Sequence, residues 1–368
     1  MFERRLYFHI DWLLLGAILI LCGIGLAMIY STTYVVVGTS GHASPMVWKQ
    51  VYALGIGLVA LLVCLTLDYR MLAEHSLAIY AGLIALLLFV LVKGATQMGG
   101  QRWIPIGPFN FQPSEFGRLT VALILAMFYG ENRRGARNTS DLVIGGFFTL
   151  IPLLLIAKQP DLGTAVTLLP VFLGIAYLAG LRLRLLAAIA LVGVMLAPVA
   201  WTFALKDYQK SRIQTFIDPS QDPQGAGYQT IQARVTVGSG GLMGKGFRNG
   251  TQGLYKFLPV AHNDFIFSVL AEEQGFIGVL VALGLYLFVV LRSLEAARLA
   301  KDRLGAYLVG GIIAGFSFQV LYNVAMSVGL APVKGITLPL MSYGGSSIIA
   351  TLAAFGLVLN VRMRRFTN

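Results

Sequence analysis

The sequence predicts an all-α polytopic membrane protein with ten transmembrane helices and a long extracytoplasmic loop between spans 7 and 8. Of its 368 residues, 57% are hydrophobic and only 12% are charged, and the mean hydropathy is +0.76. Soluble domains carry about 25% charged residues. A water-soluble core could not hide so much apolar surface, so the solvent around most of this chain must be lipid.

A hydrocarbon core of about 30 Å requires a span of about 20 mostly apolar residues. Ten segments fit this description, at residues 12–30, 50–67, 73–92, 115–130, 142–157, 162–181, 185–205, 265–291, 305–329 and 345–361. The first lacks a small-x-small cleavage site and nine more follow it, so we do not expect a removed signal peptide. Residues 1–368 are expected to form one membrane domain, with residues 206–264 as its large outer loop.

The distribution of Lys and Arg predicts which side of the membrane each loop occupies. With the N-terminus inside, fifteen of the 28 basic residues fall in inner segments and six fall in short outer segments. Short loops follow the positive-inside rule. This distribution predicts that both termini are cytoplasmic and that the loop 206–264 is external.

The outer loop is basic, with seven basic residues and four acids. Two explanations stay open: long loops cross the membrane regardless of charge, or the loop forms a seat for anionic head groups or a diphosphate. Beyond a turn-rich stretch at 218–225, Tyr228, Ile231 and Val235 share one helical face, which predicts a short interfacial helix.

Nucleotide, metal and disulfide chemistry find little support. The stretch Gly244-Lys245-Gly246 is not a P-loop, because Ser239 replaces the first Gly and Gly246 replaces the Ser or Thr that would hold Mg²⁺. There is no acidic pair to clamp a nucleotide-sugar metal, and we expect no nucleic-acid partner. Both cysteines lie inside spans and the four histidines are scattered, so neither a disulfide framework nor a structural metal site is predicted.

Several polar groups stand at the predicted membrane boundary, where ionisable residues are costly and suggest function. Glu115 and Arg118 are an i, i+3 pair that either neutralises itself or helps to hold a phosphate, with Arg102 upstream. Asp161 opens the sixth span, as a helix cap or as part of a site. For Ser342, before the tenth span, packing, a hinge and ligand binding all stay open.

Asp264 is the carboxylate at the edge of the eighth span, at the end of a glycine-rich basic segment. An acid at a membrane boundary, next to a basic loop, suits chemistry on an anionic lipid. Glu272 and Glu273 follow roughly 12 Å further along a helix that rises about 1.5 Å per residue. Two adjacent acids at that depth need partners, so we expect a structural role for them.

Seven stretches together resemble the SEDS family (shape, elongation, division and sporulation proteins). They run in the family's order and cover nearly the whole chain: 101–107, 111–118, 159–164, 218–228, 238–246, 264–273 and 339–347. Residues 159–164, 244–246 and 250–252 are more similar to the elongation members than to the division members.

The resemblance implies a ten-span peptidoglycan glycosyltransferase that polymerises lipid II for cell elongation and rod shape in the bacterial cytoplasmic (inner) membrane. It also implies a class B penicillin-binding protein as the transpeptidase partner, besides lipid II, the nascent glycan strand and membrane lipids. The family's essential loop aspartate corresponds to Asp264. Asn263, Arg118 and Val260 stand where the family usually has Thr, Lys and Glu.

Chain growth on a lipid diphosphate needs one base for the acceptor hydroxyl, because the diphosphate leaves without help from an acid. We expect Asp264 to be this catalytic base. Six residues are expected to bind substrate, namely Arg102, Glu115, Arg118, Asp161, Lys245 and Ser342. No residue is predicted as a metal ligand, and a divalent cation (Mg²⁺ or Mn²⁺) stays open as a cofactor.

Three alternatives are a lipid II flippase, a division-type member of the same family, and a scaffold without a site. A flippase should carry its essential charges near the bilayer midplane. Here the polar groups gather at the outer boundary and no internal repeat is evident, which favours an enzyme. A scaffold leaves the glycine-rich outer loop unexplained.

Overall fold

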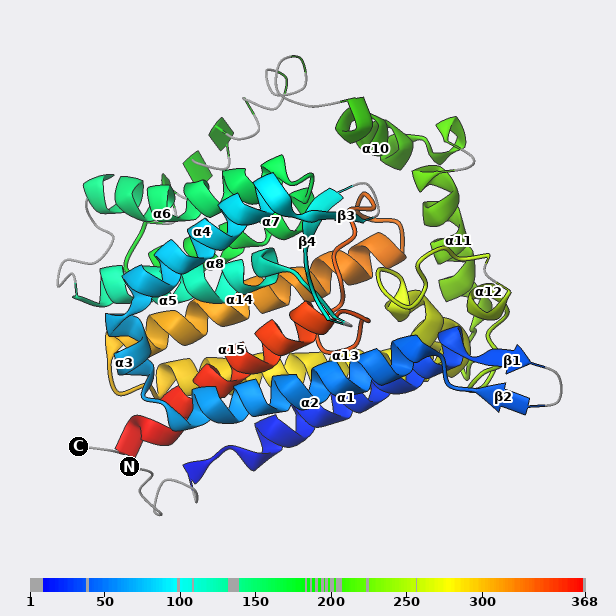
Figure 1. Cartoon of the computed structure of the whole chain (residues 1–368), viewed down its shortest axis with the longest axis horizontal. Helices are drawn as coiled ribbons and strands as arrows, with labels where there is room; N and C mark the ends of the chain where they lie inside the picture. Colours follow the sequence, from blue (N-terminus) through cyan, green and yellow to red (C-terminus); the bar gives the residue numbers. More distant parts are fainter. Residues whose placement is uncertain are drawn as a thin grey trace.

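The chain forms a bundle of long helices in the computed structural model (Figure 1). The start of α1 (Trp12–Thr33) and the end of α15 (Gly345–Met363) lie at one end of the bundle. The opposite end carries α10 (Asp207–Ile217), α11 (Ala226–Ser239) and α12 (Thr251–Leu254). The structure describes residues 9–37, 40–97, 100–107, 109–131, 139–182, 207–222, 225–255 and 257–366, with isolated positions between 184 and 202.

Nine of the ten predicted spans coincide with helices. The helices not yet named are α2 (Pro45–Thr66), α3 (Tyr69–Glu74), α4 (Ser76–Lys93), α5 (Gly117–Glu131), α6 (Thr139–Lys158), α7 (Leu162–Val166), α8 (Leu168–Leu178), α13 (Ile266–Arg298) and α14 (Arg303–Ser327). Seven of the described helices are long and apolar enough to cross a membrane, and the stretch from α7 to α8 is shorter. The chain is therefore a multi-pass, mostly helical protein. The seventh predicted span, 185–205, lies mostly outside the described residues, so the count of ten stays a prediction.

A seam of close contact joins α15 to α2. A Cβ on Gly356 would come within 2.5 Å of the carbonyl oxygen of Leu61, so only glycine permits this approach. Small residues at membrane-helix interfaces allow backbones to come this close. Asn360, fully buried on α15, donates its amide to main-chain carbonyls at the end of α2, including that of Leu65 at 2.7 Å.

Short strands between the helices were not predicted, because none exceeds seven residues. The strands β1 (Val35–Val37) and β2 (Ser40–His42) form an antiparallel hairpin. A second antiparallel sheet has the order β3 (Ala95–Gln97), β4 (Gly100–Ile106), β5 (Phe109–Phe111). Strand β4 carries Arg102, and β5 leads through a 3₁₀ turn (Pro113–Phe116) into α5.

Helix α13 bends at Gly275, whose φ of 66° is left-handed. The glycine-rich loop at residues 241–246 bonds to the main chain of α13 at this bend. The N–H groups of residues 276–277 donate to the carbonyls of 241–242, and the N–H groups of 245–246 donate to the carbonyls of 272–273, at 2.9–3.2 Å. The loop therefore satisfies backbone groups on both sides of the bend.

Glu272 and Glu273 lie on the arm before the bend, and both are buried. The expectation that they need partners is confirmed. Lys245 Nζ lies 2.6 Å from Glu272 Oε1, and the Ser31 hydroxyl donates to Glu273.

The predicted short helix in the outer loop is α11, and it packs against α13. Its buried face consists of small residues, among them Thr230, Ala233 and Thr236. Ile231 and Val235, on the face that the sequence predicts as apolar, are exposed. The helix is thus attached through its small side chains, and its apolar face is free.

Candidate active site

Asp264 lies in the turn that leads into α13. The carbonyl of Val260 accepts hydrogen bonds from the N–H groups of Asn263 (3.0 Å) and Asp264 (3.2 Å). Val260 has a φ of 53°, a strained conformation for a β-branched residue, and such strain concentrates at functional sites. Oδ1 of Asp264 is buried and has no hydrogen-bond partner among the described residues. Its lone pairs are therefore free to accept a proton.

The loop between α14 and α15 forms a wall against this carboxylate. Gly335, with a φ of 67°, lies so close that a Cβ there would be 3.4 Å from Asp264 Oδ2. Asn323 of α14 donates to the main-chain oxygens of Asp264 (2.9 Å) and Ile336 (2.7 Å). One side chain thereby contacts both the segment that carries the acid and the loop that faces it.

Ser342 acts on the same turn through main-chain contacts. Its hydroxyl donates to the carbonyl of Asn263 at 2.6 Å and accepts from the N–H of Leu338 at 2.8 Å. The N–H of the next residue, Tyr343, donates to the carbonyl of His262 at 3.0 Å. The structure thus places Ser342 beside Asp264 as a support for its backbone, and substrate contact by its hydroxyl stays a prediction.

Charges around Asp264 adjust its acidity. Burial raises the pKa of Asp264 to about 6, the guanidinium groups of Arg212 and Arg102 oppose this rise, and the Asp161 carboxylate adds to it. A carboxylate with a pKa near the working pH can accept a proton and release it again, which suits a general base.

Asp161 has the capping role that the sequence left open, and it also belongs to the site. Its Oδ1 accepts from the N–H of Thr164 at 3.2 Å, which caps α7, and its Oδ2 accepts from Gln112 Nε2 at 2.9 Å. Arg102 Nη1 lies 3.7 Å from Asp161 Oδ1. Both expected residues, Arg102 and Asp161, therefore lie close enough to Asp264 to act on its charge.

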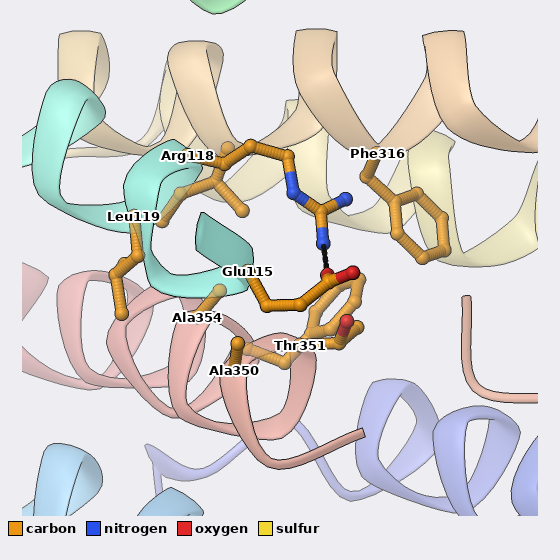
Figure 2. A pocket seen from close by; sticks show the side chains of 9 residues that line it. Glu115, Arg118, Leu119, Phe316, Ala350, Thr351 and Ala354 are labelled. Carbon is orange, nitrogen blue, oxygen red and sulfur yellow. Dashed lines mark hydrogen bonds and ion pairs between the residues drawn. The ribbon is translucent and has the colours of Figure 1, made fainter. Parts of the chain in front are cut away.

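Glu115 and Arg118 form the expected ion pair, 2.9 Å apart. Figure 2 shows the two charged groups pointing toward each other, with Phe316 of α14 and Thr351 of α15 beside them. The cavity that they line measures about 30 Å³, enough for one or two waters and too small for a diphosphate. The hypothesis that Arg118 contacts phosphate stays a prediction, and in this structure its observed partner is Glu115.

Lys245 lies in a separate network. Its Nζ contacts Glu272 Oε1 at 2.6 Å and Thr251 Oγ1 at 3.0 Å, and the main-chain N–H of Thr251 also donates to Glu272, at 2.9 Å. This network attaches the glycine-rich loop to α13. Lys245 is not among the charges that act on Asp264, and its role in substrate binding stays a prediction.

Two cations of the site were missed from the sequence. Arg212 of α10 donates to the carbonyl of Val333 at 3.2 Å and acts on Asp264. Lys334 precedes Gly335, and burial together with Arg212 lowers its pKa. The sequence signal was present, since Lys334 is the only basic residue of its outer segment. Nothing in the sequence indicated that α10 would bring Arg212 to this loop.

Comparison with known proteins gives the class to which this fold and site belong. A family model described as "Cell cycle protein", covering FtsW, RodA and SpoVE, matches residues 11–366. The peptidoglycan glycosyltransferase MrdB of Escherichia coli (strain K12) is 36% identical over 342 residues, which cover 92% of each chain. A probable peptidoglycan glycosyltransferase FtsW of Geobacter sp. (strain M18) is 38% identical over 363 residues, 96% of this chain and 97% of that one.

Solved structures agree over the whole length. A chain from a study titled "Structural coordination of polymerization and crosslinking by a peptidoglycan synthase complex" superposes with a TM-score of 0.82 at 33% identity, covering 98% of this chain and 99% of that one. The rod shape determining protein RodA of Thermus thermophilus gives a TM-score of 0.72 at 30% identity, covering 98% of both chains. The protein thus belongs to the FtsW/RodA/SpoVE family of membrane proteins, the family that the sequence motifs indicate.

Proposed function

We propose that this protein polymerises lipid II into glycan strands for cell elongation, with Asp264 as the general base. It is a peptidoglycan glycosyltransferase, as its family relatives are named. The observation that carries the proposal is the buried Oδ1 of Asp264, unpartnered among the described residues, at a turn where the guanidinium groups of Arg212 and Arg102 act on its charge.

The reaction needs one proton transfer and one displacement. The acceptor sugar hydroxyl gives its proton to Asp264 as its oxygen attacks the anomeric carbon of the donor lipid. The bond between that carbon and the diphosphate oxygen breaks, and undecaprenyl diphosphate leaves with the electron pair. A single displacement inverts the configuration at the anomeric carbon, and one positioned carboxylate suffices.

The leaving group determines where the substrate lies. A diphosphate requires cations. Arg102 and Arg212 act on the charge of Asp264, and Lys334, which Arg212 acts on, precedes the Gly335 that lies against the carboxylate. Preorganised cations on a transferring group's phosphates stabilise the negative charge that develops there. A divalent cation would bind through one or two carboxylates and the substrate's phosphates, for which Asp264 and Asp161 are the carboxylates present.

The cellular setting follows from the same proposal. The catalytic turn faces the outer side of the bacterial cytoplasmic membrane, and both termini are cytoplasmic. A class B penicillin-binding protein would crosslink the strands made here. One similar chain comes from a complex in which polymerisation and crosslinking are coordinated, which supports this choice of partner.

The direct test uses purified protein, alone and with its partner transpeptidase, incubated with labelled lipid II. We expect a ladder of glycan polymer on a gel from the wild type and none from Asp264→Asn. Transport of fluorescent lipid II across proteoliposomes without polymer would instead favour the flippase.

A further inference from the structure

Asn323 holds together the two segments that form the catalytic turn. It lies one turn before the end of α14 and is fully buried. Its Nδ2 donates to the main-chain oxygen of Asp264 at 2.9 Å and to that of Ile336 at 2.7 Å. These acceptors are 72 residues apart in the sequence. One of them belongs to the proposed base, and the other follows Gly335, which lies against the base's carboxylate.

The chemistry of this contact specifies the side chain. Both acceptors are carbonyl oxygens, which can only accept, so the group between them must donate two hydrogen bonds, and Asn323 Nδ2 donates both. An Asn amide carries two N–H donors. Asp offers no donor when ionised and one when protonated, Ser offers one, and Leu, of similar size, offers none.

A second amide on the same helix face reinforces the arrangement. Gln319, one turn before Asn323, is buried and donates through Nε2 to Thr337 Oγ1 at 3.3 Å. Helix α14 therefore contacts the loop through both amides, at residues 336 and 337. Of the two amides, only Asn323 also contacts the Asp264 segment. The Oδ1 atom of Asn323 is buried and unpartnered within the described residues, so the donors are what the site uses.

We propose that Asn323 is a positioning residue for the glycosyl transfer, fixing the carboxylate of Asp264 against the Gly335 loop. This inference rests on the proposed function. Ser342 and Tyr343 still join the loop to residues 262–263 when Asn323 is replaced. The direct link between the Asp264 carbonyl and Ile336 is lost, so the carboxylate shifts relative to Gly335 and water reaches it. The base then lies away from the acceptor hydroxyl, and its pKa falls toward that of a solvated Asp.

The test measures lipid II polymerisation by the full-length protein with its partner transpeptidase. We compare Asn323→Leu, Asn323→Asp, Asn323→Ser and Asn323→Gln in kcat, KM and pH profile. A misplacement of about 1 Å can reduce the rate about 10²-fold. We expect Asn323→Leu to lose about 10²-fold in kcat with KM within threefold, and the acid limb of its pH profile to move to lower pH. Asn323→Gln, which keeps two donors on one nitrogen, should recover part of the loss.

Asn360 provides a matched control. It is also fully buried and also donates its amide to main-chain carbonyls, but at the other end of the bundle, between α15 and α2. Asn360→Leu should lower thermal stability and leave the pH profile of the folded fraction unchanged. If Asn323→Leu does not insert into the membrane, the kcat and pH profiles of Asn323→Ser and Asn323→Gln are compared with those of the wild type instead.

Two results separate the possible failures. If the wild type polymerises lipid II, Asp264→Asn does not, and Asn323→Leu keeps kcat within threefold with an unmoved pH profile, then the positioning role is wrong and the proposed function stands. If Asp264→Asn polymerises lipid II normally, the proposed role of the base is wrong, and the role of Asn323 with it.

Discussion

Arg102 Nη1 lies 3.7 Å from Asp161 Oδ1, and the same guanidinium acts on the carboxylate of Asp264. Two acids thus lie near one cation. The Asp161 carboxylate raises the pKa of Asp264, and the Arg102 guanidinium lowers it. The acidity of the proposed base is therefore a balance that single substitutions can move in either direction.

The first prediction concerns the base itself. Asp264→Asn keeps the size of the side chain and removes the basic lone pair, and a general base contributes about 10² to 10⁴ in rate. We expect a correctly inserted, partner-bound protein with that loss, measured as polymer from labelled lipid II. Asp264→Glu should lose about 10²-fold, because the extra methylene moves the carboxylate by about 1 Å. Activity within threefold of wild type for Asp264→Asn would remove the base from the mechanism.

The second prediction is the pH dependence. Burial raises the pKa of Asp264 to about 6, and only the deprotonated carboxylate can accept a proton. The polymerisation rate should therefore be full above this pKa and fall about tenfold per pH unit below it. Arg212→Gln removes a cation and should move the midpoint to higher pH, whereas Asp161→Asn removes an acid and should move it to lower pH.

The control for these shifts is Arg298→Gln, the same chemical change at an exposed position near the end of α13. It should leave the midpoint where it is. Shifts of Arg212→Gln and Asp161→Asn in the same direction would contradict the proposed charge balance.

The third prediction concerns Glu115 and Arg118. Removing one partner of a buried ion pair leaves the other charge uncompensated and costs about 3–5 kcal/mol. Arg118→Met and Arg118→Glu should lose activity and thermal stability, while Arg118→Lys keeps the charge and most of the activity. The double variant Glu115→Gln/Arg118→Met should have a higher melting temperature than Arg118→Met alone. A double variant as unstable as the single one would show that the pair is not the source of the loss.

The fourth prediction is the orientation in the membrane. Cysteines placed at Ser220, in the outer loop, and at Ser140, in the first turn of α6, should respond differently to an impermeant thiol reagent added to whole cells. Only the first should be labelled, because the charge distribution places Ser220 outside and Ser140 inside. Labelling of Ser140→Cys alone would invert the topology.

The fifth prediction tests the bend in α13. Ala at position 275 would place a Cβ 2.2 Å from the nitrogen of Gly244, at a positive φ, so Gly275→Ala should lower stability by about 1–3 kcal/mol. Gly284→Ala lies on the same helix with open space around it and should be neutral. Equal melting temperatures for the two variants would mean that the close approach at the bend is unimportant.

The helical spans and the family were predictable, because hydropathy and family motifs are local properties of the sequence. The external position of the loop 206–264 and the role of Asp264 stay predictions. The pairs Glu115–Arg118 and Asp161–Thr164 were also predictable. In each pair the partners are three residues apart, the spacing at which helical ion pairs and N-terminal caps form. Arg212 and Asn323 were not. Each reaches a partner more than 50 residues away in the sequence, and only the packing of the bundle places them there.

The bend in α13 was missed for a related reason. Only the short polar stretch 272–274 interrupts the apolar run beside Gly275, so residues 265–291 were expected to form one span. The break depends on a second segment, 241–246, that supplies hydrogen bonds to both sides. The pairing of Lys245 with Glu272 depends on the docking of the same segment.

The hydrogen bonds at this bend divide the outer loop into a fixed part and a part that can rearrange. The N–H groups of residues 276–277 stand at the start of the lipid-embedded arm, and their acceptors are the carbonyls of 241–242. An unsatisfied backbone group in lipid costs several kcal/mol, so residues 241–246 stay docked whenever α13 spans the membrane. Residues 241–246 therefore take no part in opening the site to a lipid substrate, and crosslinks that immobilise 241–246 should leave substrate entry intact.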